Sequence, residues 1–590
     1  MTTLSKRSDI DLWLRQTKLV DSARKISVVG DARTHGTNYT ISKAGTYDFS
    51  NIEITHRALN GAGQAQLVTI EDVENVMILN LSADGESLKR NGVTLRGVIK
   101  NITLDGGNLT NMRNFGVQYA DSRTRPNLAN IDGLTIKNYR IRGAVGPTGD
   151  GSGLNLFPRS VNSRGAPAAT NVVVTDNWID VSQGEIDNKK HGPQAFKFNN
   201  INGLWGDYNY ARGGDVCAFN ITNGCRNVYF NVIETEFANR GLQIDSDANF
   251  TRGNTGNITI NHLRYRHENV RGERIGLYVD GNVSNLTLNS VDTNGTIVIH
   301  KDSNSTLQQL RIHNITLREG AVFSMGATSP ALPVTQAKLG PFTCHDNKGA
   351  CAINIGNAYR DFNDTEVYLI SAASSQRSVV QNYGERNYFH GIIVTSGNTA
   401  NTVNTAALID WGNKTHIAQI AVGGIQNLSY FVRKRGGNGF KIDSVSGVVT
   451  DVFGFSFENQ EQNSLPIGNL SVNSPFIDLA APSQTSLPFF TATKTCYLIG
   501  IMAVFQGGTG DRVMKAVQIR KNNDNIVNYI TPSGLDAGYM INFSNTVGVN
   551  ASTKRHRKLN RGDQLSCSTI GSGVGIGTCR WVINIVEAAD

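Results

Sequence analysis

Short apolar segments between Asn227 and Asp302 constrain the fold more than any other part of the chain. Within each, apolar residues alternate with other residues, which is the period of a β-strand with one buried face. Strands of a second kind, which begin with asparagine, lie between them, and strands of the same kind recur at intervals of roughly 20 to 35 residues. Such a repeat is typical of coils that stack on one another. The first kind comprises Gly241–Asp245, Gly276–Asp280 and Thr296–His300, and the second comprises Asn227–Phe230, Asn257–Ile260 and Asn285–Leu288.

The asparagine-led strand starts continue over much of the chain. A single coil cannot bury its own apolar face, so stacking is needed to build internal ladders of Leu, Ile, Val and Phe at a spacing of ~4.8 Å. Two long intervals, with insertions at 159–170 and 184–193, predict loops that protrude from one turn. The starts lie at or near Asn51, Asn75, Asn101, Asp132, Asn171, Gly203, Asn227, Asn257, Asn285 and Asn314.

Composition favours an all-β chain. Gly is plentiful (61) and Pro scarce (13), and Asn-Gly, Asp-Gly and Gly-Asn pairs punctuate the short strands. The seven cysteines are scattered without CxxC spacing, so we expect buried free thiols and no metal or other cofactor. Cys344 with Cys351, and Cys567 with Cys579, are the closest candidates for a bridge.

Charge and hydropathy narrow the partners. The net charge of +8 agrees with a polyanionic partner but does not require one, and no stripe dense in Lys and Arg argues for nucleic acid. No apolar run approaches the roughly 20 residues that span a bilayer, so no membrane partner is expected. The first residues lack a long apolar core behind their basic residues, so we expect synthesis in a cytoplasm.

The pattern predicts three parts. Residues 1–45 are expected to form a separate attachment or capping segment, with a short amphipathic helix over Asp9–Val20, or else a frayed tail. The coils extend from 46 to 480 and become less regular after about residue 327. A linker rich in Pro and Ser follows, and the longer apolar strands of residues 481–590 predict a compact β-sandwich that binds sugars or knits chains together.

Alternation along the strands assigns the outward-facing side chains. Leu242 and Ile244 point inward, which leaves Gln243 and Asp245 outside, and Tyr278 and Asp280 follow one coil later. Stacking therefore predicts two external columns. One contains Lys197, Asn220, Gln243, Tyr278 and Val298, and the other contains Asn199, Thr222, Asp245, Asp280 and His300.

Two carboxylates on neighbouring coils suit acid–base chemistry. Like charges about 5 Å apart raise one pKa, so one carboxyl stays protonated as general acid while the other stays ionised. Asp247, Glu234 and Glu236 are further candidates, and Arg264 faces Glu234 one coil on. Amide, phenol and cationic side chains around carboxylates are suited to gripping sugar hydroxyls or an acidic sugar.

Structural roles compete with each of these assignments. Asp280 before Gly281 is typical of a turn former, and Asp245 and Asp247 can cap a turn or hold an ion. Glu234 with Arg264 fits a surface ion pair, His300 a surface histidine, and Tyr278 a cover for a coil edge. If the coil register differs by one or two residues, other aspartates on the same coils become candidates for the site.

The paired strands Gly241–Asp247 and Gly276–Asp280 resemble, in their organisation, the bacteriophage tailspike proteins that degrade capsular or O-antigen polysaccharide. The resemblance implies a right-handed parallel β-helix with a C-terminal β-rich domain, assembled as a homotrimer in the virion and acting at the bacterial surface. It also implies attachment to a phage tail or baseplate protein through the first 45 residues. The Asn-Thr-Asp, Asp-Asp and Gly-His-Gly motifs of pectin-degrading β-helix hydrolases are absent from the sequence.

We therefore expect an endo-acting glycoside hydrolase that depolymerises a bacterial surface polysaccharide. Asp245 and Asp280 are the expected catalytic pair, with Asp247, Glu234 and Glu236 in reserve. Expected substrate contacts are Gln243, Tyr278, Lys197, His300 and Arg264. Two alternatives stay open: a polysaccharide lyase, which would use Lys197, Tyr278 or Arg264 beside a uronate carboxyl, and an adhesin fibre without catalysis.

Overall fold

The computed structural model describes the chain in segments. They are residues 24–31, 39–50, 52–59, 65–85, 90–120, 130–143, 151–157, 169–182, 194–246, 255–267, 274–301, 307–327, 336–345, 351–357, 362–373, 378–396, 405–423, 428–447, 455–457, 468, 470–475, 477–478, 487–506, 516–522, 524–530, 540–542, 558–570 and 578–588. The helix expected over Asp9–Val20 lies outside them, as does Asp247. The chain divides into two compact units, Met1–Ile315 and Thr316–Asp590.

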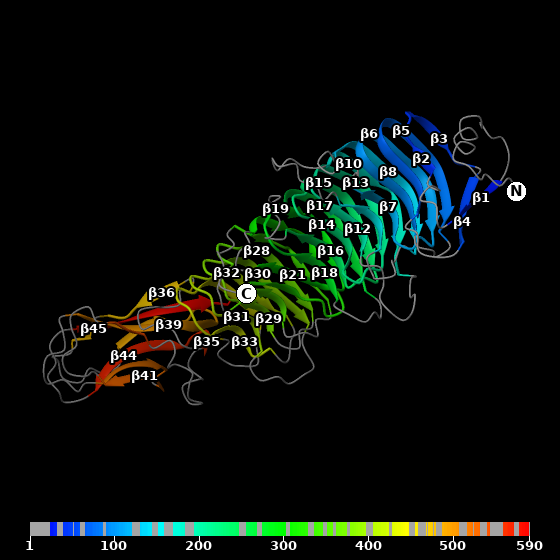
Figure 1. The fold of residues 1–590 in the computed structure, drawn as a ribbon. Helices are drawn as coiled ribbons and strands as arrows, with labels where there is room; N and C mark the ends of the chain where they lie inside the picture. Colours follow the sequence, from blue (N-terminus) through cyan, green and yellow to red (C-terminus); the bar gives the residue numbers. More distant parts are fainter. Residues whose placement is uncertain are drawn as a thin grey trace. The chain divides into compact units, whose positions relative to one another are not determined.

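The first unit consists of parallel β-strands wound into coils, in which strands of successive coils lie side by side (Figure 1). Its strands are β1 (Arg24–Asp31), β2 (Tyr39–Ile41), β3 (Gly45–Asp48), β4 (Ile52–Leu59), β5 (Ala65–Asp84), β6 (Arg90–Thr110), β7 (Phe115–Ala120), β8 (Asn130–Arg142), β9 (Ser152–Leu156), β10 (Ala169–Thr175), β11 (Asn177–Asp180), β12 (Gln194–Asn199), β13 (Ile201–Arg212), β14 (Cys217–Thr222), β15 (Arg226–Glu236), β16 (Arg240–Asp245), β17 (Thr255–Arg266), β18 (Ile275–Val279), β19 (Val283–Leu288), β20 (Val291–Thr293), β21 (Thr296–Lys301) and β22 (Leu307–Ile312).

Further coils and two antiparallel sheets make up the rest. The strands from Ile315 on are β23 (Ile315–Leu317), β24 (Phe323–Ala327), β25 (Lys338–Leu339), β26 (Phe342–Cys344), β27 (Cys351–Ile355), β28 (Glu366–Ala373), β29 (Ser378–Asn382), β30 (Tyr388–Ser396), β31 (Ala406–Asp410), β32 (His416–Val422), β33 (Tyr430–Lys434), β34 (Lys441–Gly447), β35 (Phe455–Phe457), β36 (Leu470–Asn473), β37 (Ile477–Asp478), β38 (Leu487–Thr491), β39 (Cys496–Gln506), β40 (Ala516–Lys521), β41 (Asp524–Ile530), β42 (Met540–Asn542), β43 (Lys558–Leu559), β44 (Gln564–Ile570) and β45 (Thr578–Glu587).

The expected right-handed parallel β-helix is confirmed. Between β13 and β18, each coil contributes one long strand and one short strand, so β13 pairs with β15 and β15 with β17, while β14 pairs with β16 and β16 with β18. Parallel pairing begins upstream of residue 46, because β1 pairs with β4. The three-part division of the chain stays a prediction.

The asparagine-led starts are the corners of the coils. Asn227, Asn257 and Asn285 have φ values of 52°, 53° and 52°, in the left-handed region that asparagine tolerates better than most residues. Their side chains also connect the coils, because Asn257 Nδ2 donates to Asn227 Oδ1 (3.1 Å) and Asn285 Nδ2 donates to Asn257 Oδ1 (2.9 Å). The recurrent asparagine therefore makes the turn and holds the next coil in register.

Apolar side chains fill the inside of the coils. Leu242, Ile244, Leu277 and Val279 are fully buried, as alternation predicts, and each contributes roughly 1.5–3 kcal/mol by leaving water. Phenylalanine rings fill neighbouring coils, where the ring centroids of Phe196 and Phe219 are 4.8 Å apart.

The C-terminal residues form the expected β-sandwich. One sheet has the order β36-β45-β39-β42 and the other β38-β44-β40-β41. Buried side chains from both, including Trp581 and Ile583 from the first and Ile519 and Leu565 from the second, form a single core. Among the described residues, no helix has the length and apolar character to span a membrane.

All seven cysteines are free and buried. The expectation of buried free thiols is confirmed, and neither Cys344–Cys351 nor Cys567–Cys579 forms a bridge.

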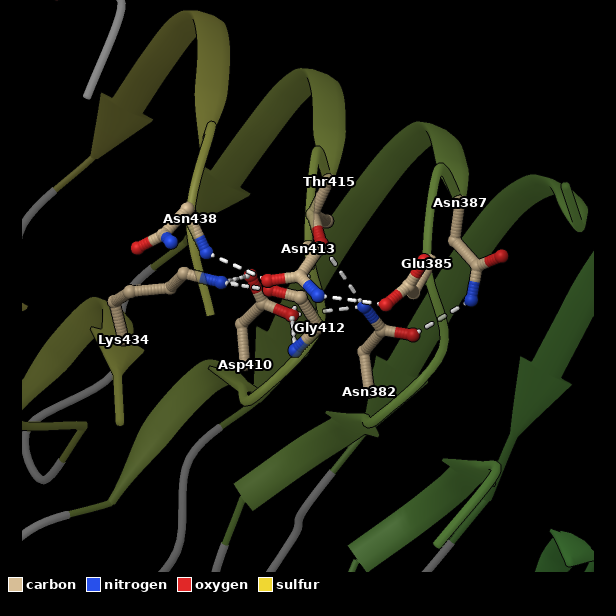
Figure 2. Close-up of polar contacts among 9 residues, drawn as sticks. All are labelled: Asn382, Glu385, Asn387, Asp410, Gly412, Asn413, Thr415, Lys434 and Asn438. Atoms are coloured by element: carbon tan, nitrogen blue, oxygen red, sulfur yellow. Dashed lines mark hydrogen bonds and ion pairs between the residues drawn. The ribbon is translucent and has the colours of Figure 1, made fainter. Parts of the chain in front are cut away.

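A buried ion pair holds neighbouring coils of the second unit together (Figure 2). Lys434 Nζ lies 2.8 Å from Asp410 Oδ2, and both side chains are fully buried. Asp410 Oδ1 accepts hydrogen bonds from Asn382 Nδ2 (2.8 Å), Thr415 Oγ1 (3.1 Å) and the Gly412 amide (3.0 Å). Because each charge has an opposite charge and hydrogen-bond partners, we interpret this ion pair as stabilising the coil corner.

Replacing Lys434 with Met should lower the stability of the second unit strongly, because it leaves the Asp410 charge buried and without its cation. Breaking such a pair costs about 3–5 kcal/mol. Lys441→Met is the matched control, since Lys441 pairs with Asp443 at 3.1 Å on the surface and exposed pairs contribute about 1 kcal/mol or less. Calorimetric unfolding of both variants would contradict this account if the two midpoints fell equally.

Candidate functional site

The two predicted columns lie in register on successive short strands. Lys197 on β12 pairs with Asn220 on β14, Asn220 with Gln243 on β16, and Gln243 with Tyr278 on β18. Likewise, Asn199 pairs with Thr222 and Thr222 with Asp245. Asp280 follows the end of β18, and its amide donates to the Ile244 carbonyl (3.0 Å), so the two aspartates lie on neighbouring coils.

Tyr265 on β17 explains why two of these strands start with glycine. Its fully buried ring lies against Gly241 and Gly276, and its hydroxyl donates to the Ala238 carbonyl (2.6 Å). A Cβ atom at Gly241 would clash with this ring. The repeated glycine therefore makes room for a core tyrosine and fixes the path of the strands that carry the aspartates.

A hydrogen-bonded array centred on Arg240 connects the carboxyl groups. Arg240 Nη1 donates to Gln243 Oε1 (3.0 Å), and Gln243 Nε2 donates to Asp245 Oδ2 (2.5 Å). On the next coil, the Tyr278 hydroxyl donates to Asp280 Oδ2 (3.0 Å), and the Arg240 guanidinium lies 4.1 Å from the Tyr278 ring centroid. One cation thus orients the partners of both aspartates.

Burial makes Asp245 hard to ionise. Desolvation raises the pKa of its carboxyl above the ordinary value, and the charge of Asp280 adds to this. Hydrogen bonds from Thr222 and Gln243 and the charge of Lys197 act in the opposite direction without cancelling the rise. Burial, and then the charge of Asp280, also raise the pKa of the Tyr278 hydroxyl. Asp245 therefore tends to keep its proton.

The outer face of these strands is more buried than alternation alone predicts. Asn220, Thr222 and Gln243 are buried, whereas Asp280 and Tyr278 are partly exposed. Asp245 is partly exposed as a whole residue, but its carboxyl oxygen Oδ1 is buried. Several amide atoms here have no hydrogen-bond partner: Asn155 Oδ1, Asn220 Oδ1, and both the oxygen and the nitrogen of Asn199. Buried polar groups are normally paired, so these unpaired amide atoms are unusual for a buried position.

Glu234, Glu236 and Arg264 belong to a different column, on the long strands β15 and β17. The Glu234 carboxylate accepts from the Tyr208 hydroxyl (3.0 Å), and Glu236 accepts from Tyr210 (2.7 Å). Arg264 pairs in register with Glu234. The structure therefore brings Gln243 and Tyr278 to the aspartates but leaves these three residues on the adjoining strands.

Two predicted residues are described only in part or not at all. His300 belongs to β21, but its side chain lies outside the described residues, as does the whole of Asp247. Lys197 is described, and its ammonium lies 4.5 Å from the Phe157 ring centroid. Within the described part of the chain, no cluster of three or more His, Cys, Asp or Glu side chains could hold a metal ion.

Alternation along the strand does not predict that Arg240 contacts the site. Arg240 is the first residue of β16, two residues before the inward Leu242, so alternation predicts that its side chain also points inward. Its side chain instead reaches Gln243 and Tyr278 from the corner, and only the contacts in space reveal this.

Comparison with solved structures returns proteins of similar fold. The tailspike of Escherichia coli bacteriophage HK620, solved with a pentasaccharide, is 12% identical over 98% of this chain and 90% of its own, with a TM-score of 0.33. Bacteriophage tailspikes are thus among the structures that the chain resembles. No protein-family model and no curated protein matches the sequence.

Other structures with this likeness differ in activity. A tailspike from Acinetobacter baumannii bacteriophage Fri1, described as a capsular polysaccharide depolymerase, is 10% identical over 100% of this chain and 83% of its own, with a TM-score of 0.17. The mannuronan C-5 epimerase A-module from Azotobacter vinelandii is 12% identical over 79% and 92%, with a TM-score of 0.20. Likenesses this distant say nothing about the site of this chain.

The burial of Asp245 predicts an inverted pH dependence of stability. Because its folded-state pKa lies above the unfolded value, Asp245 favours the folded state most at low pH, and this advantage is lost as pH rises from the unfolded pKa through the folded one. Asp245→Asn carries no charge, so its unfolding temperature should gain on that of the wild type as pH rises through this range. Differential scanning calorimetry at a series of pH values measures the gain.

Asp132→Asn is a matched control with the opposite sign. Hydrogen bonds from Thr170 and Asn171 lower the pKa of Asp132, so that carboxyl stabilises the fold at higher pH and the advantage is lost as pH falls. The burial argument is wrong if Asp245→Asn shows the same pH trend as Asp132→Asn.

Proposed function

We propose that this chain hydrolyses glycosidic bonds of a bacterial surface polysaccharide, with Asp245 as general acid and Asp280 as its carboxylate partner. The observation that carries the proposal is the pair itself: two carboxyl groups on neighbouring coils, one with a pKa raised by burial and both oriented through Arg240. A carboxyl pair in unlike environments is what glycoside hydrolysis requires.

The roles follow from the contacts. Burial raises the pKa of Asp245 and so favours the protonated form, which can give its proton to the leaving oxygen. Asp280 accepts hydrogen bonds from the Tyr278 hydroxyl (3.0 Å) and the Gly281 amide (2.9 Å), which fix the orientation of its carboxylate. Neighbouring coils are about 4.8 Å apart, which is close to the ~5–5.5 Å carboxyl separation of retaining enzymes.

The amides beside the pair support a sugar ligand. Asn155, Asn199 and Asn220 lie on the three coils before Gln243 and leave acceptor or donor atoms unused. Sugar hydroxyls both donate and accept, so a polysaccharide that follows the coil axis would satisfy these atoms in succession once their side chains, which are shielded from solvent here, turn outward. Lys197, in the same column, would contact an acidic substituent.

Two of the three candidate bases for β-elimination, Tyr278 and Arg264, suit that reaction poorly, while Lys197 in the same column as Tyr278 keeps a lyase as the alternative. A lyase needs a base that takes the proton beside a uronate carboxyl. Burial and the neighbouring Asp280 raise the pKa of Tyr278, so its phenol holds its proton, and Arg264 belongs to another column.

Asp245→Asn and Asp280→Asn should each lower the release of new reducing ends from purified capsular polysaccharide by at least about 100-fold, the usual contribution of a general acid or base. Binding of the polysaccharide should persist. Colorimetric measurement of reducing ends, with mass spectrometry of the fragments, checks both expectations.

Asp132→Asn, on another part of the coil surface, should cleave like the wild type. Undiminished product release by Asp245→Asn would refute the assignment. Ultraviolet absorption of an unsaturated product would identify a lyase, and binding without new reducing ends would identify an adhesin.

The other expectations drawn from the resemblance stay predictions. They are the homotrimer, a place in the virion at the bacterial surface, and attachment to a phage tail or baseplate protein through the first 45 residues. Asp247, Glu234 and Glu236 remain reserve candidates for catalysis, and His300 and Arg264 for substrate contact.

A further inference from the structure

A hollow of about 780 Å³ lies over the long strands of the first unit, on β6, β8 and β11. Its lining includes Asn108, Asn138, Arg140, Arg142, Asp176 and Trp178. Its volume falls in the range of pockets that hold small ligands, about 300–1,000 Å³. Nothing in the proposed hydrolysis uses these residues.

The hollow is separate from the carboxyl pair. Arg140 pairs in register with Trp178, and Trp178 with Tyr210, so this column follows β8, β11 and β13. Asp245 and Asp280 belong instead to the coil segment formed by β16 and β18. A ligand in the hollow would therefore contact a different set of strands.

Trp178 forms a firm wall of the hollow. Its ring stacks on Tyr210 with centroids 5.7 Å apart and planes 7° apart. The register places β13 on one side of β11 and β8 on the other, so Tyr210 backs the ring while Arg142 approaches from the side of the hollow, 5.9 Å from the ring centroid. The Tyr210 hydroxyl is itself fixed by Glu236 (2.7 Å). A partly exposed, braced indole is suited to stacking on a sugar ring.

The charged groups around this wall favour a carboxylate. Arg140 and Arg142 are both exposed, two residues apart on β8, and therefore on the same face. Asp176, the acidic side chain of the lining, accepts a hydrogen bond from Thr175 (3.1 Å). Guanidinium groups pair with carboxylates through two parallel hydrogen bonds, and the amides of Asn108 and Asn138 are suited to hydroxyls.

We propose that this hollow is a second, non-catalytic binding site for a uronate unit of an acidic glycan. The carboxylate pairs with Arg140 and Arg142, the sugar ring packs against Trp178 beside the Arg142 guanidinium, and the hydroxyls contact the amides. The site stands on its own residues, so it holds whether or not Asp245 and Asp280 cleave a polysaccharide.

The test is binding of soluble uronate polymers to the full chain carrying Asp245→Asn, which separates binding from turnover. Biolayer interferometry would use polygalacturonate, alginate and hyaluronan, their carboxyl-reduced forms, and neutral dextran. At least one uronate polymer should bind, more weakly as salt rises, and its reduced form should bind about tenfold more weakly or worse. Adding Trp178→Ala or Arg142→Ala should cost the same factor.

Trp205→Ala is the matched control, because Trp205 is also an exposed tryptophan (43%) but lies on the first half of β13, outside the hollow. It should leave binding unchanged, and Trp178→Phe, which keeps an aromatic wall, should retain most of it. The proposal is overturned if none of the uronate polymers binds, if reduced and native polymers bind equally, or if Arg142→Ala and Trp178→Ala bind like the parent.

Discussion

Parallel pairing of each coil with the next is the interaction on which the rest of this structure depends. Every column of side chains exists because backbone hydrogen bonds set one strand residue directly beside its counterpart one coil later. The corners make the pairing unique. Asn227, Asn257 and Asn285 adopt left-handed φ values and bond side chain to side chain, so a shift by one residue would break the turn and the amide ladder together. Such a shift would also turn the apolar side chains outward.

An aspartate that ends a short strand serves structure in the second unit and is a candidate for chemistry in the first. Asp410 faces the coil interior, whereas Asp245 faces outward, one residue after the inward Ile244. Asp410 is fully buried, and its charge is balanced by the Lys434 ammonium and by three hydrogen-bond donors. Asp245 has another carboxyl on the next coil in place of a lysine. A buried carboxyl beside a like charge prefers to hold a proton, which is the property of a general acid.

Under these proposals, two polar surfaces of the first unit would each bind part of a polymer. The short strands carry the carboxyl pair beside a row of amides with unused hydrogen-bonding atoms. The long strands carry a hollow with an indole wall and two guanidinium groups. Each coil advances about 4.8 Å, comparable to one sugar residue, so a column over several coils matches a short stretch of glycan. A regular solenoid thus converts a sequence repeat into a row of equivalent contacts.

The sequence alone determined the coil and its register near the candidate site. Period-2 alternation and the spacing of asparagines place Gln243 beside Tyr278 and Asp245 beside Thr222, because both signals are local and repeat with the coil. Only the tertiary structure decided which strand faces are buried and which side chains at the coil corners reach the site. Alternation predicts that Asn220 and Gln243 are exposed, but both are buried. Arg240 contacts the site although its position in the strand predicts an inward side chain. The Arg142 guanidinium lies over the Trp178 ring although the two residues are more than 30 apart in the sequence. Burial and corner geometry depend on how distant segments pack, and a strand pattern carries no record of that packing.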